Sequence, residues 1–299
     1  MNHSPLVSVI IPAYKGQQRI ARAVNSIFAQ DYSHWEIVII SDDCSDYEQV
    51  LADQGIRSNR IQFQSTGQVG SGAANARNVG LDNAKGDIIA LLDCDDEFHP
   101  HRLSRILPLV RKYGAAVSDL KLIDEKTGQE IPNISIKSTN EKMLPDQVFH
   151  RFFHAQSVAV FDRKLITHNY TRLPRYEDNI FLMQMYNSVD VIGFDCAPHY
   201  HYYKYHGAAT SFSVNGADVS GAFLKSANEI KAAILNDQIY FKSENLKRIV
   251  CESMDCAVAA QSFFVDRCQK SPDVLLNYGK EMSKFLDEWP LPASLLATR

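Results

Sequence analysis

Residues 86–100 read GDIIALLDCDDEFHP, and the rest of the chain is organised around this stretch. The apolar run from Ile88 to Leu92 is typical of a strand that is buried on both faces of a parallel sheet. The run stops at three acids, Asp93, Asp95 and Asp96. The stretch therefore predicts the central strand of an α/β fold, with carboxylates at its carboxyl end.

The three acids suggest a site for a divalent cation. Clustered carboxylates raise one another's pKa unless a cation lies among them. Hard oxygen ligands suit magnesium, manganese or calcium better than zinc. The alternative is a solvated acidic turn, because Asp is common where strands end.

The composition is typical of a globular protein. The 299 residues are 45% hydrophobic and 22% charged, which is enough for a substantial core. The formal net charge of −4, without a basic run that contains aromatic residues, argues against a nucleic-acid partner. We see neither a signal-peptide pattern nor a run of roughly 18 apolar residues. We therefore expect a cytoplasmic protein without a transmembrane segment, while peripheral association with the inner face of the cell membrane and the oligomeric state stay open.

Strand and helix patterns alternate through the first hundred residues. We expect strands at 7–13, 35–40, 61–64 and 88–92, and helices at 17–29, 47–55 and 73–84. Pro12 is expected to end the pairing of the first strand, because it has no N–H. This alternation is typical of right-handed βαβ units, in which ligands bind outside the carboxyl ends of the strands. Three such ends carry Tyr14, the pair Asp42 and Asp43, and the acids after Leu92.

The remainder of the chain changes from a mixed to a helical pattern. We expect strands at 115–123 and 131–136 as a hairpin, then at 157–161, 189–194 and 199–205, with helices at 101–112, 163–168 and from 177. From about residue 215 the patterns are helical only, at 223–235, 246–265 and 274–286. These patterns predict an α/β domain over residues 1–214 and a helical C-terminal appendage over residues 215–299.

Five motifs follow one another along the chain. They are SVIIPAY at 8–14, EIVIISDDCS at 36–45, ARNVGL with AKGD at 76–87, LDCDD at 92–96 and the pair Glu177-Asp178. In order and spacing they resemble the motifs of family 2 glycosyltransferases with the GT-A fold, over about residues 6–206. The resemblance implies a mostly parallel, Rossmann-type central sheet flanked by helices. It also implies a nucleotide-sugar-binding half over about 1–100 and an acceptor half over about 101–214.

The resemblance implies a donor site at the carboxyl ends of the strands. In this family the matching positions bind the nucleotide sugar, and here they are Pro12, Tyr14, Asp43, Arg77, Asp93 and Cys94. Tyr14 would offer an aromatic face to the base, and Asp43 would accept a hydrogen bond from it, with Asp42 as a structural partner. The alternatives are a packed tyrosine and a buried Arg77 that pairs with Asp93.

The resemblance also implies a metal site and a general base. Mn²⁺ or Mg²⁺ would be bound by Asp95, Asp93 and His206 and would neutralise charge on the departing nucleoside diphosphate. The sequence does not separate the role of Asp96 from that of Asp95. Asp178 matches the base that deprotonates an acceptor hydroxyl, which then attacks the sugar from the side opposite the leaving group, so that its configuration inverts. The alternatives are a helix N-terminal acid for Asp178 and a packed or surface histidine at position 206.

The chain departs from the family pattern in two places. Cys44 stands where the family usually has glycine, so we expect a turn of different shape. The Gln-x-x-Arg-Trp signature and the membrane helices of processive synthases are missing, which favours transfer of a single sugar.

These observations together predict a metal-dependent, inverting glycosyltransferase. It would move one sugar from a UDP-linked donor to a glycan or lipid-linked glycan acceptor, in the synthesis of cell-surface polysaccharide. Two other functions remain. A sugar nucleotidyltransferase is disfavoured, because no glycine-rich basic loop follows the first strand. A non-catalytic scaffold or partner subunit that binds the nucleotide sugar is not excluded by the sequence.

Overall fold

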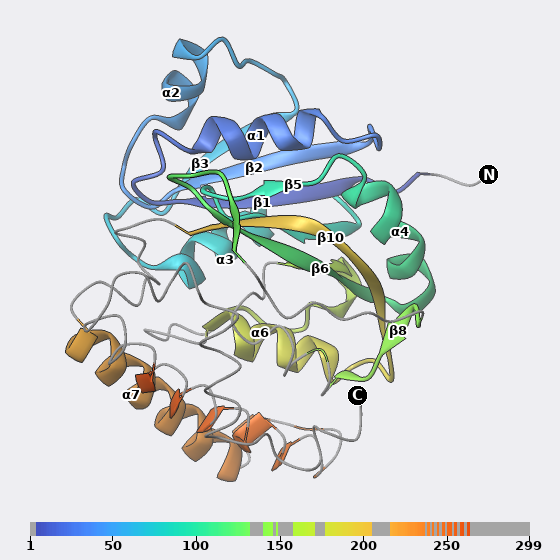
Figure 1. The fold of residues 1–299 in the computed structure, drawn as a ribbon, viewed down its shortest axis with the longest axis vertical. Helices are drawn as coiled ribbons and strands as arrows, with labels where there is room; N and C mark the ends of the chain where they lie inside the picture. The colour runs from blue at the N-terminus through green and yellow to red at the C-terminus, as the bar shows by residue number, and fades with distance from the viewer. Residues whose placement is uncertain are drawn as a thin grey trace.

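A mixed sheet runs through the centre of the computed structural model, which describes residues 4–131, 140–145, 148, 158–170, 177–204, 216–236 and scattered positions between 238 and 263 (Figure 1). Within these residues the sheet has ten strands, in the order β3-β2-β1-β4-β9-β6-β10-β5, with β7 beside β6 and β8 beside β10. The strands are β1 (Val7–Ala13), β2 (Trp35–Ser41), β3 (Ile61–Ser65), β4 (Ile88–Leu91), β5 (Glu97–Phe98), β6 (Ala115–Asp124), β7 (Glu130–Ile131), β8 (Lys142–Met143), β9 (Ala159–Asp162) and β10 (Ile192–Lys204).

The first four strands are parallel, as the alternating pattern predicts. β2 pairs with β3 and β1, and β1 also pairs with β4. The expected strand ranges agree with the structure to within one residue. Val9, Ile10 and Ile11 are 0% exposed, because helices cover both faces of the sheet. The predicted fold class, a mostly parallel α/β sheet flanked by helices, is therefore confirmed.

Pro12 lies inside β1, so the expectation that it ends the pairing of this strand is wrong. β1 pairs with β2 as far as Ala13 and Ser41. The backbone groups of successive residues point alternately to the two neighbouring strands, so the nitrogen of Pro12 points to the same side as the backbone groups of Ile10. That side is the β4 side, because the carbonyl of Ile10 accepts from the N–H of Leu92. The pairing of β1 with β4 has ended before Pro12, so its missing N–H removes no ladder hydrogen bond.

The strands of the second half extend the same sheet. β9 lies between β4 and β6 and is antiparallel to both. β6 forms the expected hairpin with β7 within the described residues. The two strands expected at 189–194 and 199–205 are instead one, β10, which pairs with β6 on both sides of a register shift between Asp195 and Tyr200. The break between the two expected strands is thus a local irregularity within one strand. The two-residue strands β5 and β8 were not anticipated.

Most helices begin and end within three residues of the predicted limits, but the helix expected at 223–235 begins seven residues earlier, and the one expected at 163–168 is a shorter 3₁₀ turn. They are α1 (Ile20–Phe28), α2 (Tyr47–Asp53), α3 (Ala73–Asn83), α4 (Arg102–Tyr113), a 3₁₀ turn at Arg163–Leu165, α6 (Glu177–Tyr186) and α7 (Gly216–Leu235). In α1 the buried residues Ile20, Val24 and Ile27 recur at helical spacing. α1 and α3 lie on opposite sides of the sheet, and α7 lies beyond α6 (Figure 1).

Helix α6 contributes to two hydrophobic clusters. Phe181, Leu182 and Met185 belong to the main core, whereas Ile180 and Met183 pack with Ala227, Ile230 and Ile234 of α7 and with Val250 and Met254. A helix that is apolar on more than one side is expected to be buried between neighbours. The division at residues 214 and 215 stays a prediction, and the helix expected at 274–286 lies outside the described residues. In the described part of the chain, none of the helices has the length and apolar character needed to cross a bilayer.

Candidate active site

The carboxyl ends of β2, β1 and β4 meet at one edge of the sheet. β1 lies between β2 and β4 and is parallel to both. The residues that follow these strands, Tyr14, Asp42 with Asp43, and Asp93 to Asp96, therefore come together. The predicted convergence of the three strand ends is present in the fold.

The Asp43 carboxylate is held in place by several hydrogen-bond donors. The backbone N–H of Lys15 donates to Oδ2 over 2.7 Å, and that of Ser45 donates to Oδ1 over 3.1 Å. The side chains of Gln17 and Tyr47 donate to Oδ2 over 3.0 and 3.1 Å. Burial by itself would raise the pKa of Asp43, but these hydrogen bonds hold the pKa below its ordinary value. Asp43 is therefore an ionised acceptor at neutral pH.

Cys44 adopts a φ of 59°, within the left-handed region. The side chain at this position therefore does not prevent the conformation that glycine adopts most easily. The expected change in the shape of the turn is not observed in the backbone of Cys44.

Asp42 is a structural residue, as expected. Its carboxylate is buried and accepts from Thr66 Oγ1 over 2.8 Å, from the N–H of Ser71 over 3.1 Å and from the N–H of Gly72 over 2.9 Å, and Ser71 Oγ also donates to it. Asp42 thus fixes the 66–72 loop, which leads into α3.

The Tyr14 side chain is 44% exposed at the end of β1. Gly70 of the 66–72 loop lies beside it, since a Cβ at that position would be 3.7 Å from the tyrosine ring. Cys94 lies on the inner side of the β1–α1 loop. Its thiol accepts from the N–H of Tyr14, burial raises its pKa, and a Cβ on Gly16 would be 2.8 Å from its Sγ. The Cys94 side chain therefore supports the loop that carries Tyr14.

Arg77 of α3 joins the end of β4 to the start of α6. Its Nη2 lies 3.1 Å from Asp93 Oδ1 and its Nη1 lies 3.4 Å from Glu177 Oε1. Burial would lower the pKa of Arg77, but Asp93, Asp178 and Glu177 raise it above its ordinary value, together with Tyr170. The buried ion pair of Arg77 with Asp93, which the sequence left as an alternative, is present.

Asp178 has a raised pKa at the first turn of α6. Burial is the largest cause, and Arg77 offsets part of it. Asp178 Oδ1 accepts from the N–H of Asn179 over 2.8 Å. Because a general base is most effective when its pKa lies near the working pH, a raised pKa suits Asp178 to that role. The two neighbouring acids therefore differ: Glu177 pairs with Arg77, and Asp178 is the carboxylate whose proton affinity is increased.

The structure separates Asp96 from Asp95. Asp96 is 1% exposed and accepts from the Tyr200 hydroxyl and from the N–H of Tyr203, both over 2.8 Å. Burial raises the pKa of Asp96 well above its ordinary value, and the charges of Asp95 and Asp93 raise it further. Asp96 therefore faces inward and anchors the turn to β10, whereas Asp95 and Asp93 are partly exposed.

A lysine that the sequence interpretation missed lies close to these acids. Burial lowers the pKa of Lys204 to about 8, and the carboxylates of Asp96 and Asp95 partly offset this shift. Tyr200 and Tyr203, which hold Asp96, were also missed. Both tyrosines belong to the aromatic run of the strand expected at 199–205. An aromatic run does not by itself distinguish a tyrosine that binds a carboxylate from one that packs in the core.

Two predicted metal ligands can be placed. Among the residues that the structure describes, no three His, Cys, Asp or Glu side chains form a group that could hold a metal ion. His206 lies outside the described residues, so its predicted role cannot be placed. Asp93 and Asp95 remain as two partly exposed carboxylates, a donor set that suits Mg²⁺ or Mn²⁺ when the other ligands are waters and substrate phosphates.

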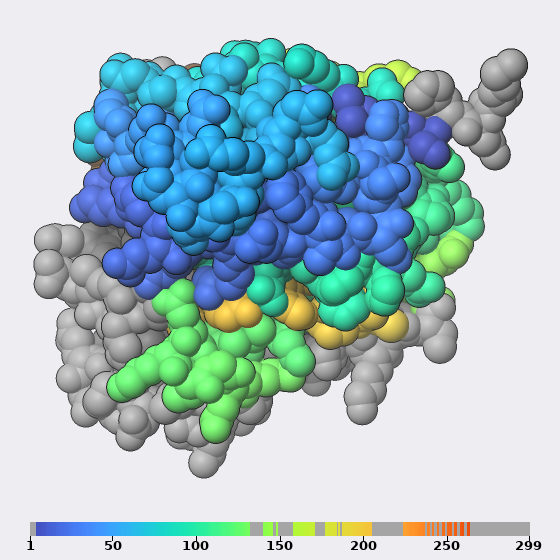
Figure 2. Space-filling model, turned by 90° about the horizontal axis from the view of Figure 1, so that it is seen from above, coloured from blue at the N-terminus to red at the C-terminus, as the bar shows by residue number. Residues whose placement is uncertain are grey.

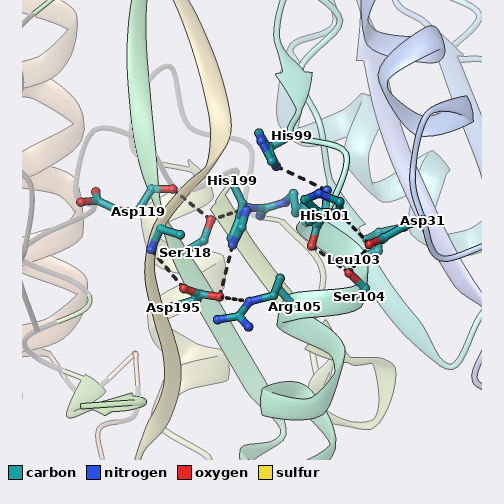
Figure 3. Close-up of polar contacts among 12 residues, drawn as sticks. Asp31, His99, His101, Leu103, Ser104, Arg105, Ser118, Asp119, Asp195 and His199 are labelled. Atoms are coloured by element: carbon teal, nitrogen blue, oxygen red, sulfur yellow. Dashed lines mark hydrogen bonds and ion pairs between the residues drawn. The ribbon is translucent and has the colours of Figure 1, made fainter. Parts of the chain in front are cut away.

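A separate cluster of histidines lies beside β5 and β10 (Figure 3). The ring centre of His99 is 5.4 Å from that of His101, 5.5 Å from that of His199 and 5.9 Å from that of His201. Three carboxylates surround the cluster: Asp31 contacts His101 over 2.8 Å, Asp195 contacts His199 over 3.2 Å and Glu97 contacts His201 over 2.8 Å. None of these residues belongs to the predicted donor site.

Sequence comparisons place these features in a family context. A family model described as "Glycosyl transferase family 2" matches residues 8–169, more than half of the chain. The chain is 36% identical over 108 residues to the putative colanic acid biosynthesis glycosyl transferase WcaA of Escherichia coli (strain K12), covering 36% of this chain and 38% of that protein. It is 34% identical over 107 residues to UDP-Glc:alpha-D-GlcNAc-diphosphoundecaprenol beta-1,3-glucosyltransferase WfgD of Escherichia coli, covering 36% and 42%. The matches thus span less than half of each relative.

Solved structures with a similar fold extend over nearly the whole chain. Staphylococcus aureus TarS 1–349 in complex with UDP-GlcNAc matches with a TM-score of 0.62 and 18% identity, over 97% of this chain and 83% of that one. The mannosyltransferase PcManGT from Pyrobaculum calidifontis in complex with GDP-Man and Mn²⁺ matches with a TM-score of 0.57 and 13% identity, over 99% and 86%. At these identities the similarity establishes the fold.

Proposed function

The chain belongs to glycosyl transferase family 2, and we propose that it transfers one sugar from a UDP-linked donor to a hydroxyl group of a glycan or lipid-linked glycan. The observation that carries this proposal is the position of Arg77. Its guanidinium contacts Asp93, at the end of the central strand, and Glu177, beside the proposed base Asp178. The proposed donor-binding acid and the proposed base therefore lie close to the same guanidinium group. Transfer requires that the donor and the acceptor be held close together in a fixed orientation.

The nucleotide end of the donor would lie between the loops after β1 and β2. The exposed ring of Tyr14 offers a surface for stacking, and the ionised Asp43 offers an acceptor for an N–H of the base. WfgD, by its name, uses UDP-glucose, which supports a UDP-linked donor here. The sugar itself is not specified by these contacts.

Asp93 and Asp95, with His206, would hold Mn²⁺ or Mg²⁺. Such an ion supplies positive charge that stabilises the diphosphate as it leaves. PcManGT was solved in complex with Mn²⁺ as well as GDP-Man, and the oxygen ligands of this chain suit the same class of ion. The proposed role of Cys94 is indirect, through support of the Tyr14 loop.

Asp178 would take the proton of the acceptor hydroxyl as its oxygen attacks the anomeric carbon. Attack from the side opposite the diphosphate inverts the configuration of the sugar. Because Arg77 lies among Asp93, Glu177 and Asp178, it would keep the base and the donor-binding acid in a fixed relation. The name of WcaA links it to colanic acid synthesis, which supports a role in cell-surface polysaccharide synthesis, on the cytoplasmic side of the membrane.

Isothermal titration with UDP, GDP and dTDP, each with Mn²⁺ and with a chelator, tests the donor site. We expect metal-dependent binding of UDP that is lost in Asp95→Asn and retained in Asp82→Asn, which changes an exposed acid on α3. Failure of all three nucleotides to bind would contradict the proposal. Metal-dependent binding without transfer to any acceptor, unchanged by Asp178→Asn, would favour the scaffold function instead.

A further inference from the structure

Arg22, on α1, contacts the turn that carries the candidate metal ligands. Its Nη2 donates a hydrogen bond to the backbone carbonyl of Asp95. The same nitrogen lies 3.0 Å from Glu125 Oε1, and the guanidinium carbon lies 3.7 Å from the ring centre of Tyr203. One side chain thus connects α1, the end of β6, the end of β10 and the acidic turn.

Glu125, which contacts Arg22, is also bound by other groups. Arg19, the residue that precedes α1, makes a bidentate contact with Glu125, with distances of 2.8 to 3.0 Å. Glu125 also donates its backbone N–H to the carbonyl of Lys204 over 2.9 Å. The green β6–β7 region adjoins the blue N-terminal region on the face seen in Figure 2.

The turn is therefore held from two sides. Arg22 binds the carbonyl of Asp95, and Tyr203, on which Arg22 stacks, donates its N–H to Asp96. The partly exposed carboxylates of Asp93 and Asp95 carry like charges, and the guanidinium of Arg77 offsets that of Asp93. We expect a fixed backbone to hold the two carboxylates in one arrangement, because loss of a group that orients a metal ligand typically lowers metal affinity by about 10- to 100-fold.

We infer that Arg22 is a positioning residue for the acidic turn, and that it sets the geometry with which Asp95 meets the cation and the diphosphate. The expected effect on binding of the cation and the diphosphate rests on the proposed function. The positioning of the acidic turn by Arg22 is a property of the protein without ligands. Arg19 provides a matched control. It shares Glu125 with Arg22 and is equally exposed, at 25%, and the hydrogen bond to the carbonyl of Asp95 comes from Arg22.

Hydrogen exchange of the metal-free protein tests the positioning directly. In Arg22→Gln we expect the amides of residues 93–96 to exchange about tenfold faster or more than in the wild type, and in Arg19→Gln at nearly the wild-type rate. Tyr203→Leu, which removes the stacking partner, is expected to act in the same direction as Arg22→Gln. Unchanged exchange in Arg22→Gln, or equal acceleration in Arg19→Gln, would overturn the inference.

Titration with UDP and Mn²⁺ tests the consequence. Arg22→Gln should weaken metal-dependent binding about tenfold or more, while Arg19→Gln binds like the wild type and neither variant alters binding in chelator. Equal weakening in both variants would contradict the assigned role. If the wild type shows no metal-dependent binding while Arg22→Gln still accelerates exchange of the turn, the proposed function fails and the positioning role of Arg22 stands.

Discussion

The guanidinium of Arg77 lies 3.1 Å from the carboxylate of Asp93, although the two residues belong to different elements and face each other across the end of the sheet. The pair is buried on the arginine side, and the second contact of Arg77, with Glu177, ties α6 to the same point. One side chain therefore joins the strand end that is proposed to bind the donor to the turn of α6 that carries the proposed base.

Arg77→Met should destabilise the fold strongly. The substitution leaves Asp93, Glu177 and Asp178 close together without their cation, and loss of one partner from a buried ionic group typically costs about 3 kcal/mol or more. Urea denaturation should show this loss. Arg57→Met, at an exposed arginine, should change the free energy of unfolding by less than about 0.5 kcal/mol. Equal stability of the two variants would show that the Arg77 pair is not needed for folding.

Asp178→Asn should slow transfer strongly while donor binding persists. Removal of a general base typically lowers the rate by about 10²- to 10⁴-fold. The pKa of Asp178 is raised, and the base must be ionised, so kcat/KM should fall as the pH drops through a value above the ordinary Asp pKa of about 3.9. The pH profile of the wild type measures this limb. A profile that stays flat down to pH 4, about the ordinary value, would contradict the assignment.

Asp95→Asn should impair UDP binding, whereas Asp96→Ala should impair stability. Asp95→Asn should remove metal-dependent UDP binding and alter stability by less than about 0.5 kcal/mol. Asp96→Ala leaves the Tyr203 N–H and the Tyr200 hydroxyl without their acceptor and should cost about 2 to 3 kcal/mol of stability. Calorimetric titration and thermal denaturation of both variants distinguish them. Loss of metal-dependent binding with full stability in Asp96→Ala would reverse the two roles.

The histidine cluster should make the fold less stable in mild acid. Burial lowers the pKa values of His99 and His199, and neighbouring cations lower them further, with Asp195 opposing this at His199. Between the two pKa values the unfolded chain binds more protons than the folded chain, so the stabilisation is complete above the unfolded pKa of about 6.5 and is lost progressively as the pH falls from there through the lower folded pKa. Urea denaturation between pH 8 and pH 5 should show this slope.

His99→Gln is the matched variant for this pH effect. His99 faces His101, His201, Lys121 and Asp31, and glutamine keeps a polar side chain at this position without a titratable group. The variant should show a shallower dependence of unfolding free energy on pH. An unchanged slope would mean that other groups account for the acid sensitivity.

The sequence predicted most of the fold because its signals are local. Apolar runs of four to seven residues mark buried strands, and the spacing of Ile20, Val24 and Ile27 marks a helix face. The order of β and α patterns then places the carboxyl ends of β1, β2 and β4 at one edge. The acids at these ends, and the general location of the site, could therefore be identified without coordinates.

The tertiary structure alone decided which way each side chain of the site faces. Asp95 and Asp96 are adjacent and chemically alike, and only the approach of Tyr200 and Tyr203 from β10 buries the second and leaves the first partly exposed. The contact between Arg22 and Asp95 and that between Arg77 and Glu177 join residues 73 and 100 positions apart. Burial, hydrogen bonding and proton affinity depend on such distant neighbours, which no local pattern in the sequence encodes.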